Sequence, residues 1–233
     1  KWTGVIPEGF TLHNYVDLFM DSNFLASVGR SIAMSIIPII VTIVIVLLAL
    51  FVTAIYFPKL EKYVQIICMI PYTIQGVILS VSILSLYVGS SSILSNRLVM
   101  LMGAYCIVIL PYIYQGIRNG MRAVNMPTLI EAAEMLGASK IYAFFRVVVP
   151  NIRSAIIVSS LLAVGIIFGD YVLIRNLAGT SAPNMQIFLY QTMKSDSTKA
   201  SAVFVVIMFV TFVITAIVLF TKSREAKGKT HRK

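Results

Sequence analysis

The stretch SIAMSIIPIIVTIVIVLLALFVTAIYF, residues 31–57, decides the fold, because its 27 consecutive positions carry no charged side chain. A helix needs about 20 apolar residues to cross the hydrocarbon core of a bilayer, which is ~30 Å thick. The stretch is therefore long enough to span a membrane with some tilt, or to extend past one interface.

Four further uncharged runs lie downstream. They cover residues 63–96, 98–117, 154–169 and 200–220. The run 63–96 has 34 residues, enough for one span and a polar tail. The run 154–169 has only 16 residues and reaches full length only if it continues through Asp170 to Ile174. Together the runs predict an all-α membrane protein with five visible spans.

The composition excludes most other classes of protein. Hydrophobic residues make up 58% and charged residues 12% of the 233 positions, and the mean hydropathy is +0.90. A soluble domain carries about 25% charged residues. The net charge of +10 does not indicate a nucleic-acid partner, because the basic residues are gathered in short segments between uncharged runs. Cys68 and Cys106 lack CxxC spacing, and we interpret them as buried apolar side chains.

The connecting segments differ in their content of Lys and Arg. Residues 58–62, residues 118–153 and the tail after Phe220 together hold 13 of the 19 basic residues. The other six are Lys1, Arg30, Arg97, Arg175, Lys194 and Lys199. Because Lys and Arg concentrate in cytoplasmic segments, the first group of segments is predicted to be cytoplasmic.

This topology predicts how the chain is divided. Residues 1–30 form an external amino-terminal segment, residues 31–220 form the transmembrane domain, and residues 221–233 form a basic cytoplasmic tail at the lipid surface. With five spans and the carboxyl terminus inside, residue 1 falls outside. We therefore expect a further span to precede the chain, giving six in all.

The segment 118–153 is the one long loop on the predicted cytoplasmic side. Thr128 and Glu131 have the spacing of a capping box, so a helix is expected from Leu129 to about Leu136. Gly137 is suited to end it in a left-handed turn, and Ser139 to cap a second helix that runs to Pro150. Ile130, Ala133 and Gly137 share one face of the first helix.

This loop resembles the EAA loop of permeases from binding-protein-dependent ABC importers. The positions that match that pattern in identity and spacing are Glu131, Ala132, Ala133, Gly137 and Pro150. Val147 and Val149 stand where the family has Ile and Leu, and they keep the apolar bulk. The resemblance implies a MetI-like transmembrane domain. Residues 10–15, FTLHNY, are similar to the segment that follows the first span in many such permeases.

The resemblance also implies partners and a location. The five matching residues would dock on a separate ATPase dimer, which binds ATP and Mg²⁺ in place of this chain. A second permease, different from this one rather than a copy, and an external solute-binding protein would complete the assembly in a bacterial cytoplasmic membrane. The span layout and the stretch 169–172, GDYV, are similar to the polyamine, iron and phosphonate branch.

The chain itself carries no recognisable catalytic set. Its sequence contains no phosphate-binding loop of the form GxxxxGK followed by Ser or Thr. It also lacks a Ser, His and Asp set, a pair of carboxylates and metal-ligand spacing. We therefore predict that it is not an enzyme, and that it holds no metal.

Four residues are candidates for a substrate path: Asp170, Tyr171, Tyr72 and Gln75. The last two lie beside expected helix breaks at Pro71 and Gly76. Asp170 is the one acidic residue that falls within a predicted span, where a charge is costly and faces a cavity or partner. It either attracts a cationic solute or lies at the interface, paired with Arg175. The alternative function, an ion-coupled secondary transporter or channel, predicts intramembrane carboxylates, inverted repeats or broken helices in corresponding halves.

Overall fold

A computed structural model describes residues 13–74, 76–89, 93–179 and 183–230. Within these ranges the chain is helical and contains no strand. The α-helices are α1 (His13–Met20), α2 (Ser22–Ile55), α3 (Glu61–Met69), α4 (Val77–Tyr87), α5 (Arg97–Ala123), α6 (Met126–Met135), α7 (Lys140–Ala143), α8 (Val149–Asn151), α9 (Arg153–Gly169), α10 (Val172–Leu177), α11 (Met185–Ser195) and α12 (Ser197–Thr230). Short helical turns join them: η1 (Pro58–Leu60), η2 (Ile70–Tyr72), η3 (Ile93–Ser95) and the π-helical η4 (Phe144–Val148).

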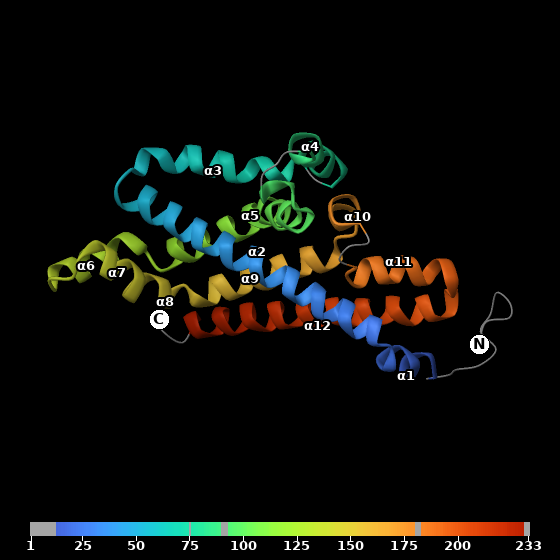
Figure 1. The fold of residues 1–233 in the computed structure, drawn as a ribbon. Coiled ribbons are helices and arrows are strands. Elements are labelled where there is room, and N and C mark those ends of the chain that lie inside the picture. Colours follow the sequence, from blue (N-terminus) through green and yellow to red (C-terminus); the bar gives the residue numbers. More distant parts are fainter. Residues whose placement is uncertain (1–12, 75, 90–92, 180–182, 231–233) are drawn as a thin grey trace.

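The long helices lie side by side along one axis of the molecule (Figure 1). α2 packs against α5 and α9, and α9 packs against α12. The connection from α2 to α3, the segment α6–α8 and the far end of α12 all lie at one end, while α1 and the α11–α12 turn lie at the other. The three segments rich in Lys and Arg are therefore grouped at the same end of the bundle.

α2 is longer than the uncharged run that predicts it. It begins after Asp21, whose carboxylate accepts a hydrogen bond from the backbone N–H of Asn23 at 3.0 Å. The helix thus includes Arg30, whose Nε donates to the carbonyl of Pro183 at 2.9 Å near the α11 end. The helix therefore continues through this charged residue, whose side chain has a polar partner.

The second predicted span is bent where helix breaks are expected, at Pro71 and Gly76. Pro58–Tyr72 and Val77–Tyr87 meet at an angle of 101°. Gly76 has a φ of +60°, in the region that glycine adopts without strain, and it precedes the first residue of α4. The positive φ of Gly76 therefore marks the place of the break.

The fourth predicted span does not reach the full length that a continuation to Ile174 would give it. α9 ends at Gly169, and Asp170 has extended backbone angles, with φ −81° and ψ 121°. The helix therefore does not continue to Ile174. Among the described residues, α2 and α5 are each long and apolar enough to cross a membrane, and each of two bent helix pairs could form one more span. α12 contributes the shorter apolar segment Ser197–Val213.

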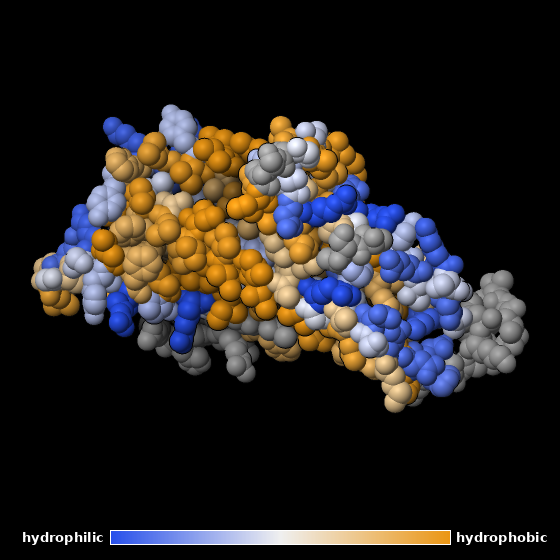
Figure 2. All heavy atoms as spheres, in the orientation of Figure 1, coloured by the Kyte–Doolittle hydropathy of each residue, from blue (hydrophilic) through white to orange (hydrophobic). Residues whose placement is uncertain are grey.

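The hydropathy of the surface changes along the long axis of the bundle (Figure 2). On the face shown, hydrophobic residues cover the middle of the molecule, and hydrophilic residues gather toward its two ends. On α2, the side chains of Ile37, Ile40 and Ile45 are each about half exposed. An apolar middle between polar ends is the pattern expected of a protein that spans a bilayer.

α5 and α9 approach each other closely. A Cβ placed on Gly116 would lie 2.5 Å from the Cβ of Ser159, and one on Gly120 would lie 2.5 Å from the Cβ of Ala155. Small residues at both helix surfaces therefore permit this packing, as they do in many membrane helix pairs. Ile113 and Ile117, also on α5, are buried in the core and have no exposed surface.

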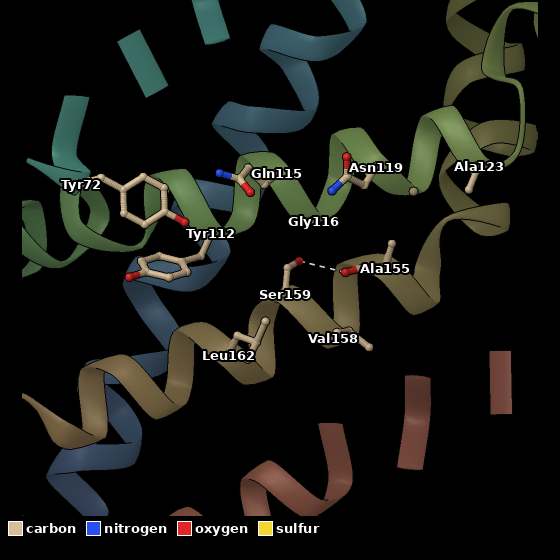
Figure 3. Close-up of a pocket in the computed structure, with 11 residues that line it drawn as sticks. Tyr72, Tyr112, Gln115, Gly116, Asn119, Ala123, Ala155, Val158, Ser159 and Leu162 are labelled. Atoms are coloured by element: carbon tan, nitrogen blue, oxygen red, sulfur yellow. Dashed lines mark hydrogen bonds between the residues drawn. The ribbon is translucent and has the colours of Figure 1, made fainter. Parts of the chain in front are cut away.

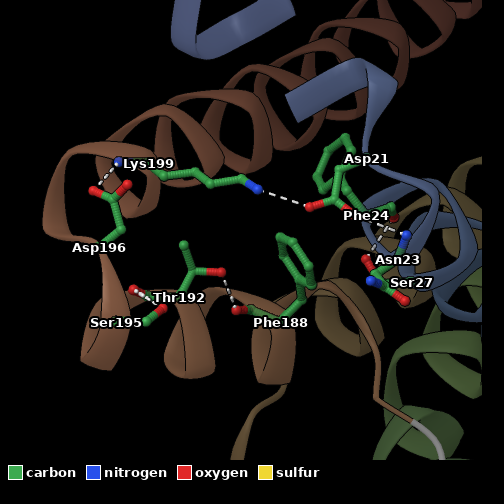
Figure 4. A network of polar contacts seen from close by, with 9 residues as sticks. All are labelled: Asp21, Asn23, Phe24, Ser27, Phe188, Thr192, Ser195, Asp196 and Lys199. Atoms are coloured by element: carbon green, nitrogen blue, oxygen red, sulfur yellow. Dashed lines mark hydrogen bonds and ion pairs between the residues drawn. The ribbon is translucent and has the colours of Figure 1, made fainter. Parts of the chain in front are cut away.

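A network of polar contacts joins helices at the end of the bundle that carries α1 and the α11–α12 turn (Figure 4). The Nζ of Lys199 lies 2.7 Å from the Oδ2 of Asp21, which joins the start of α12 to the start of α2. Asp196 accepts hydrogen bonds from the backbone N–H groups of Thr198 and Lys199 at 2.9 and 3.0 Å. The hydrogen bond from Lys199 holds the pKa of the Asp21 carboxyl below its usual value.

Candidate functional site

The first helix in the loop between α5 and α9 begins earlier than the sequence predicts. α6 starts at Met126 after Asn125, which has a φ of +49° and makes no side-chain cap. The predicted capping box of Thr128 and Glu131 is therefore wrong. Pro127 lies in the first turn of α6, where its missing N–H costs little, so the helix begins before Thr128.

The end of α6 agrees with the prediction. Gly137 has a φ of +83°, its N–H donates to the carbonyl of Glu134 at 2.9 Å, and the N–H of Ala138 donates to Ala133 at 3.0 Å. This pair of bonds is a Schellman motif, which needs a left-handed residue at the glycine position. The Oγ of Ser139 accepts from the N–H of Tyr142 at 3.3 Å, so the predicted second cap is confirmed.

Pro150 does not end the second helix. α7 is followed by the π-helical turn η4 and then by α8, which holds Pro150 in its first turn and ends at Asn151. The interruption comes at Ile152, where φ is −100° and ψ is 7°. Across it, Lys140–Asn151 and α9 meet at 65°. The proline is tolerated because a helix needs no N–H bond in its first turn.

The inner side of the loop is anchored in the core. Ala143, Phe144 and Val148 have no exposed surface, and Ile130 is 6% exposed. The ring of Phe144 lies 4.9 Å from that of Phe51 on α2, measured between centroids. The face that Ile130 shares with Ala133 therefore packs on this chain's own core. This differs from the expectation that its small residues face a partner.

The outer tip of the loop is apolar and exposed. Met135 and Leu136, directly before the turn glycine, are each 89% exposed, and Tyr142 across the turn is 58% exposed. Glu131 and Ala132 are also exposed, on the same helix. Met135 and Leu136 were not among the predicted site residues, although two large apolar residues beside a turn glycine are a readable signal. Exposed apolar groups of this kind are typical of a surface that contacts a protein or a membrane.

The structure separates the four candidate path residues. Asp170 accepts from the hydroxyl of Tyr105 at 3.2 Å and from the N–H of Ile174 at 3.3 Å, so it caps the start of α10. The expected pairing with Arg175 is wrong, because that guanidinium lies over the ring of Tyr190 at 5.8 Å. Asp170, Tyr105 and Gly76 line a cavity of about 440 Å³.

Tyr72 lies in a different place. It lines a groove of about 410 Å³ between α5 and α9, with its ring 5.0 Å from that of Tyr112 (Figure 3). Tyr171 packs against Tyr190, with ring centroids 5.2 Å apart. Gln75 falls outside the described residues. The described candidates therefore do not form one binding site.

One family model covers the loop and most of the bundle. The model for the binding-protein-dependent transport system inner membrane component matches residues 59–224. This chain belongs to that family. The family assignment agrees with the resemblance of the loop, and it identifies the chain as a membrane component of an ABC transport system.

Curated relatives of this transport component come from mycoplasmas. A probable ABC transporter permease protein of Mycoplasma genitalium is 23% identical over 239 residues, covering 91% of this chain and 72% of the relative. Its homologue in Mycoplasma pneumoniae is 25% identical over 174 residues, covering 66% of this chain and 52% of the relative. The chain thus spans about half the length of the second relative.

Solved structures share the fold of this transport component. A crystal structure of a bacterial ABC transporter that imports the acidic polysaccharide alginate has a TM-score of 0.65 and 17% identity, covering 94% of this chain and 85% of that one. A second, with an alginate pentasaccharide-bound periplasmic protein, has a TM-score of 0.65 and 18% identity, covering 91% and 81%. These matches confirm the predicted all-α, MetI-like fold. They do not confirm the polyamine, iron and phosphonate branch.

Proposed function

We propose that this membrane component forms the solute path of an ATP-driven importer, and that its loop 118–153 couples it to a separate ATPase subunit. The observation that carries the proposal is the apolar tip at Met135 and Leu136, each 89% exposed at a rigid glycine turn. Exposed apolar side chains of this size gain free energy when a partner covers them. The neighbouring carboxylate of Glu131 offers that partner an acceptor for an Arg or an N–H group.

The anchoring of the loop suits it to transmit force. A displacement of the tip reaches α2 through Phe144 and Phe51, whose rings are in contact. It reaches α9 through the junction at Ile152. Closure of an ATPase dimer would draw two such tips together and tilt the attached helices between two arrangements.

A second link joins the base of the loop to the first cytoplasmic turn. The carboxylate of Glu61, at the start of α3, lies 2.7 Å from Arg118 and 3.3 Å from Arg122, both near the end of α5. The Arg118 side chain is only 15% exposed, so this ion pair is less screened than a surface pair. It supports a concerted movement of α3 and α5 with the loop.

The remaining partners follow from the same proposal. A second permease, different in sequence, would complete the path, and an external solute-binding protein would deliver the solute at the end that carries α1 and α11. ATP and Mg²⁺ would be bound by the ATPase subunits in a bacterial cytoplasmic membrane, with the carboxyl terminus on the ATPase side. The polyamine, iron and phosphonate branch stays a prediction for the solute, and the alginate importers are related in fold.

Two loop variants test the coupling role. Glu131→Lys reverses the charge at the docking face, and Gly137→Asp strains the left-handed turn. We expect each to abolish co-purification with the ATPase and to abolish solute uptake. Asp17→Lys, an exposed carboxylate at the opposite end of the bundle, is the control and is expected to assemble normally. Normal assembly and uptake in both loop variants would remove the assignment.

The alternative is an ion-coupled secondary transporter or channel. It differs in its energy source, because it needs an ion gradient and no ATPase partner. Uptake that requires enclosed ATP and proceeds without an ion gradient favours the importer, and the reverse dependence favours the alternative.

A further inference from the structure

A polar stripe on α5 has no role in the coupling described above. Tyr112, Gln115 and Asn119 are spaced by three and four residues, so they share one face of the helix. Gln115 and Asn119 are both exposed. Among the described residues, the one side-chain hydrogen bond of these two amides runs from Gln115 Nε2 to the sulfur of Met69 at 3.1 Å. An amide turned to hydrocarbon without a partner is costly, so this face is unsuited to lipid.

The stripe borders a formed groove. The groove has a volume of about 410 Å³, within the range of small-molecule sites. Gly116 and Gly120 on α5 face Ser159 and Ala155 on α9, and these small residues leave room above the helix crossing. Figure 3 shows the amides of Gln115 and Asn119 following one another along α5.

One end of the groove meets the broken helix. Tyr72 belongs to η2, next to the place where α3 gives way to α4 at 101°. Irregular backbone at membrane depth is tolerated where it is buried in protein or lines a wet cavity. The rings of Tyr72 and Tyr112 stand at this end, 5.0 Å apart. Tyr72, beside the break, lines this groove, whereas Gly76 at the break lines the cavity at Asp170.

The lining has a definite chemical character. Its eleven residues comprise two tyrosines, two amides, one hydroxyl and otherwise glycine or apolar side chains, with no Asp, Glu, Lys or Arg. Asp170 lines the other cavity. Amides donate to and accept from hydroxyl groups, and tyrosine rings offer flat apolar surfaces for C–H groups. No carboxylate, ammonium or guanidinium group in this lining would form an ion pair with a charged solute.

We infer that this groove is part of the solute path and takes an uncharged, polyhydroxylated solute, such as a sugar or polyol unit. The inference rests on the proposed function as an importer, and it replaces the charged solutes expected of the polyamine, iron and phosphonate branch. Gln115 and Asn119 hydrogen-bond the hydroxyl groups, and Tyr72 and Tyr112 stack against the carbon skeleton. These four residues therefore set the solute class, and Asp170 holds the start of α10.

Uptake by the whole transporter tests the solute class. Proteoliposomes containing the permease with its ATPase, with ATP enclosed and the binding protein outside, are given an isotope-labelled small-molecule extract of yeast. The labelled solutes that accumulate are identified by mass spectrometry. We expect uncharged polyhydroxylated solutes. Accumulation of a solute that is ionised at neutral pH overturns the inference and leaves the proposed function standing, whereas no ATP-dependent accumulation contradicts both.

Substitutions in the stripe test the residues. Gln115→Leu and Asn119→Leu each remove hydrogen bonds to an uncharged solute, so we expect uptake to fall about 3- to 10-fold for each. Ser82→Leu on α4 makes the same kind of change outside the groove and is expected to keep wild-type uptake. Co-purification with the ATPase establishes that each variant assembles. Wild-type uptake in both stripe variants overturns the inference.

Thiol labelling tests the groove without transport. In a background with Cys68→Ala and Cys106→Ala, Asn119→Cys is expected to react with a charged, membrane-impermeant thiol reagent, because the groove is wet. Phe212→Cys, at a 69% exposed apolar position on α12, is the control for a lipid-facing site. If the cysteine at 119 reacts no faster than the control, lipid or a second subunit covers the groove and the inference fails.

Discussion

At the scale of single residues, Asp21 and Lys199 join segments 178 positions apart in the sequence. Neither residue stands out in the sequence, because each lies in a polar flank beside an apolar run. The N-cap role of Asp21 is readable from its place before a helix, but its partner is not, since only the packing of α1 against α12 brings the lysine near. Long-range ion pairs of this kind depend on the tertiary fold, and a single sequence does not contain them.

This ion pair predicts how stability depends on pH. The folded pKa of Asp21 is lowered by Lys199, so the pair contributes stability above the unfolded pKa of about 3.9 and loses it as the pH falls through the lower folded value. Asp21→Asn keeps an N-cap and removes the charge. We expect the variant to be less stable than wild type at neutral pH by about 1 kcal/mol or less. The difference in thermal midpoint, measured in detergent, should vanish in acid.

A double-mutant cycle gives the control for this pH prediction. Lys199→Gln should cost a similar amount at neutral pH, and the double variant should cost no more than either single variant. Additive losses, or a difference between wild type and Asp21→Asn that persists in acid, would show that the ion pair is not the cause.

At the scale of helices and loops, single residues predicted a turn or a cap correctly where its geometry depends only on the neighbouring backbone. Gly137 and Ser139 produce the predicted turn and cap, because both depend on neighbours within a few residues. The pattern of Thr128 and Glu131 misled, since the same spacing also occurs inside a helix that begins earlier. Pro71 and Gly76 predicted the place of the helix break, but the angle of 101° depends on packing partners that a long apolar run does not reveal.

The packing of α5 on α9 gives a second stability prediction. Gly116→Ala places a Cβ 2.5 Å from that of Ser159, so the helices must separate, at a cost of about 1–3 kcal/mol. Gly103→Ala on the same helix meets nothing within 4 Å and should be neutral or stabilising by up to about 1 kcal/mol. Thermal midpoints of the two variants in detergent compare them directly. Equal midpoints would contradict the close packing.

At the scale of the whole molecule, the distribution of charge corresponds to the direction of the bundle. The segments that hold 13 of the 19 basic residues lie at the end that carries the loop 118–153. Composition and run lengths were sufficient to predict this arrangement, because insertion in a bilayer depends on both. The groove between α5 and α9 was not predicted, since it is formed by two helices that are distant in the sequence. The spacing of Tyr112, Gln115 and Asn119 was its one visible signal.

Cross-linking between the loop and the ATPase tests the coupling role most directly. Leu136→Cys at the exposed tip, in a background with Cys68→Ala and Cys106→Ala, is labelled with a short reagent that is thiol-reactive at one end and photoactivatable at the other, and the assembled transporter is irradiated. We predict a cross-linked species that contains both the permease and the ATPase subunit. Met20→Cys, at an 80% exposed position on the opposite end of the bundle, should give none. A transporter that hydrolyses ATP normally but gives no cross-link from position 136 would contradict the account.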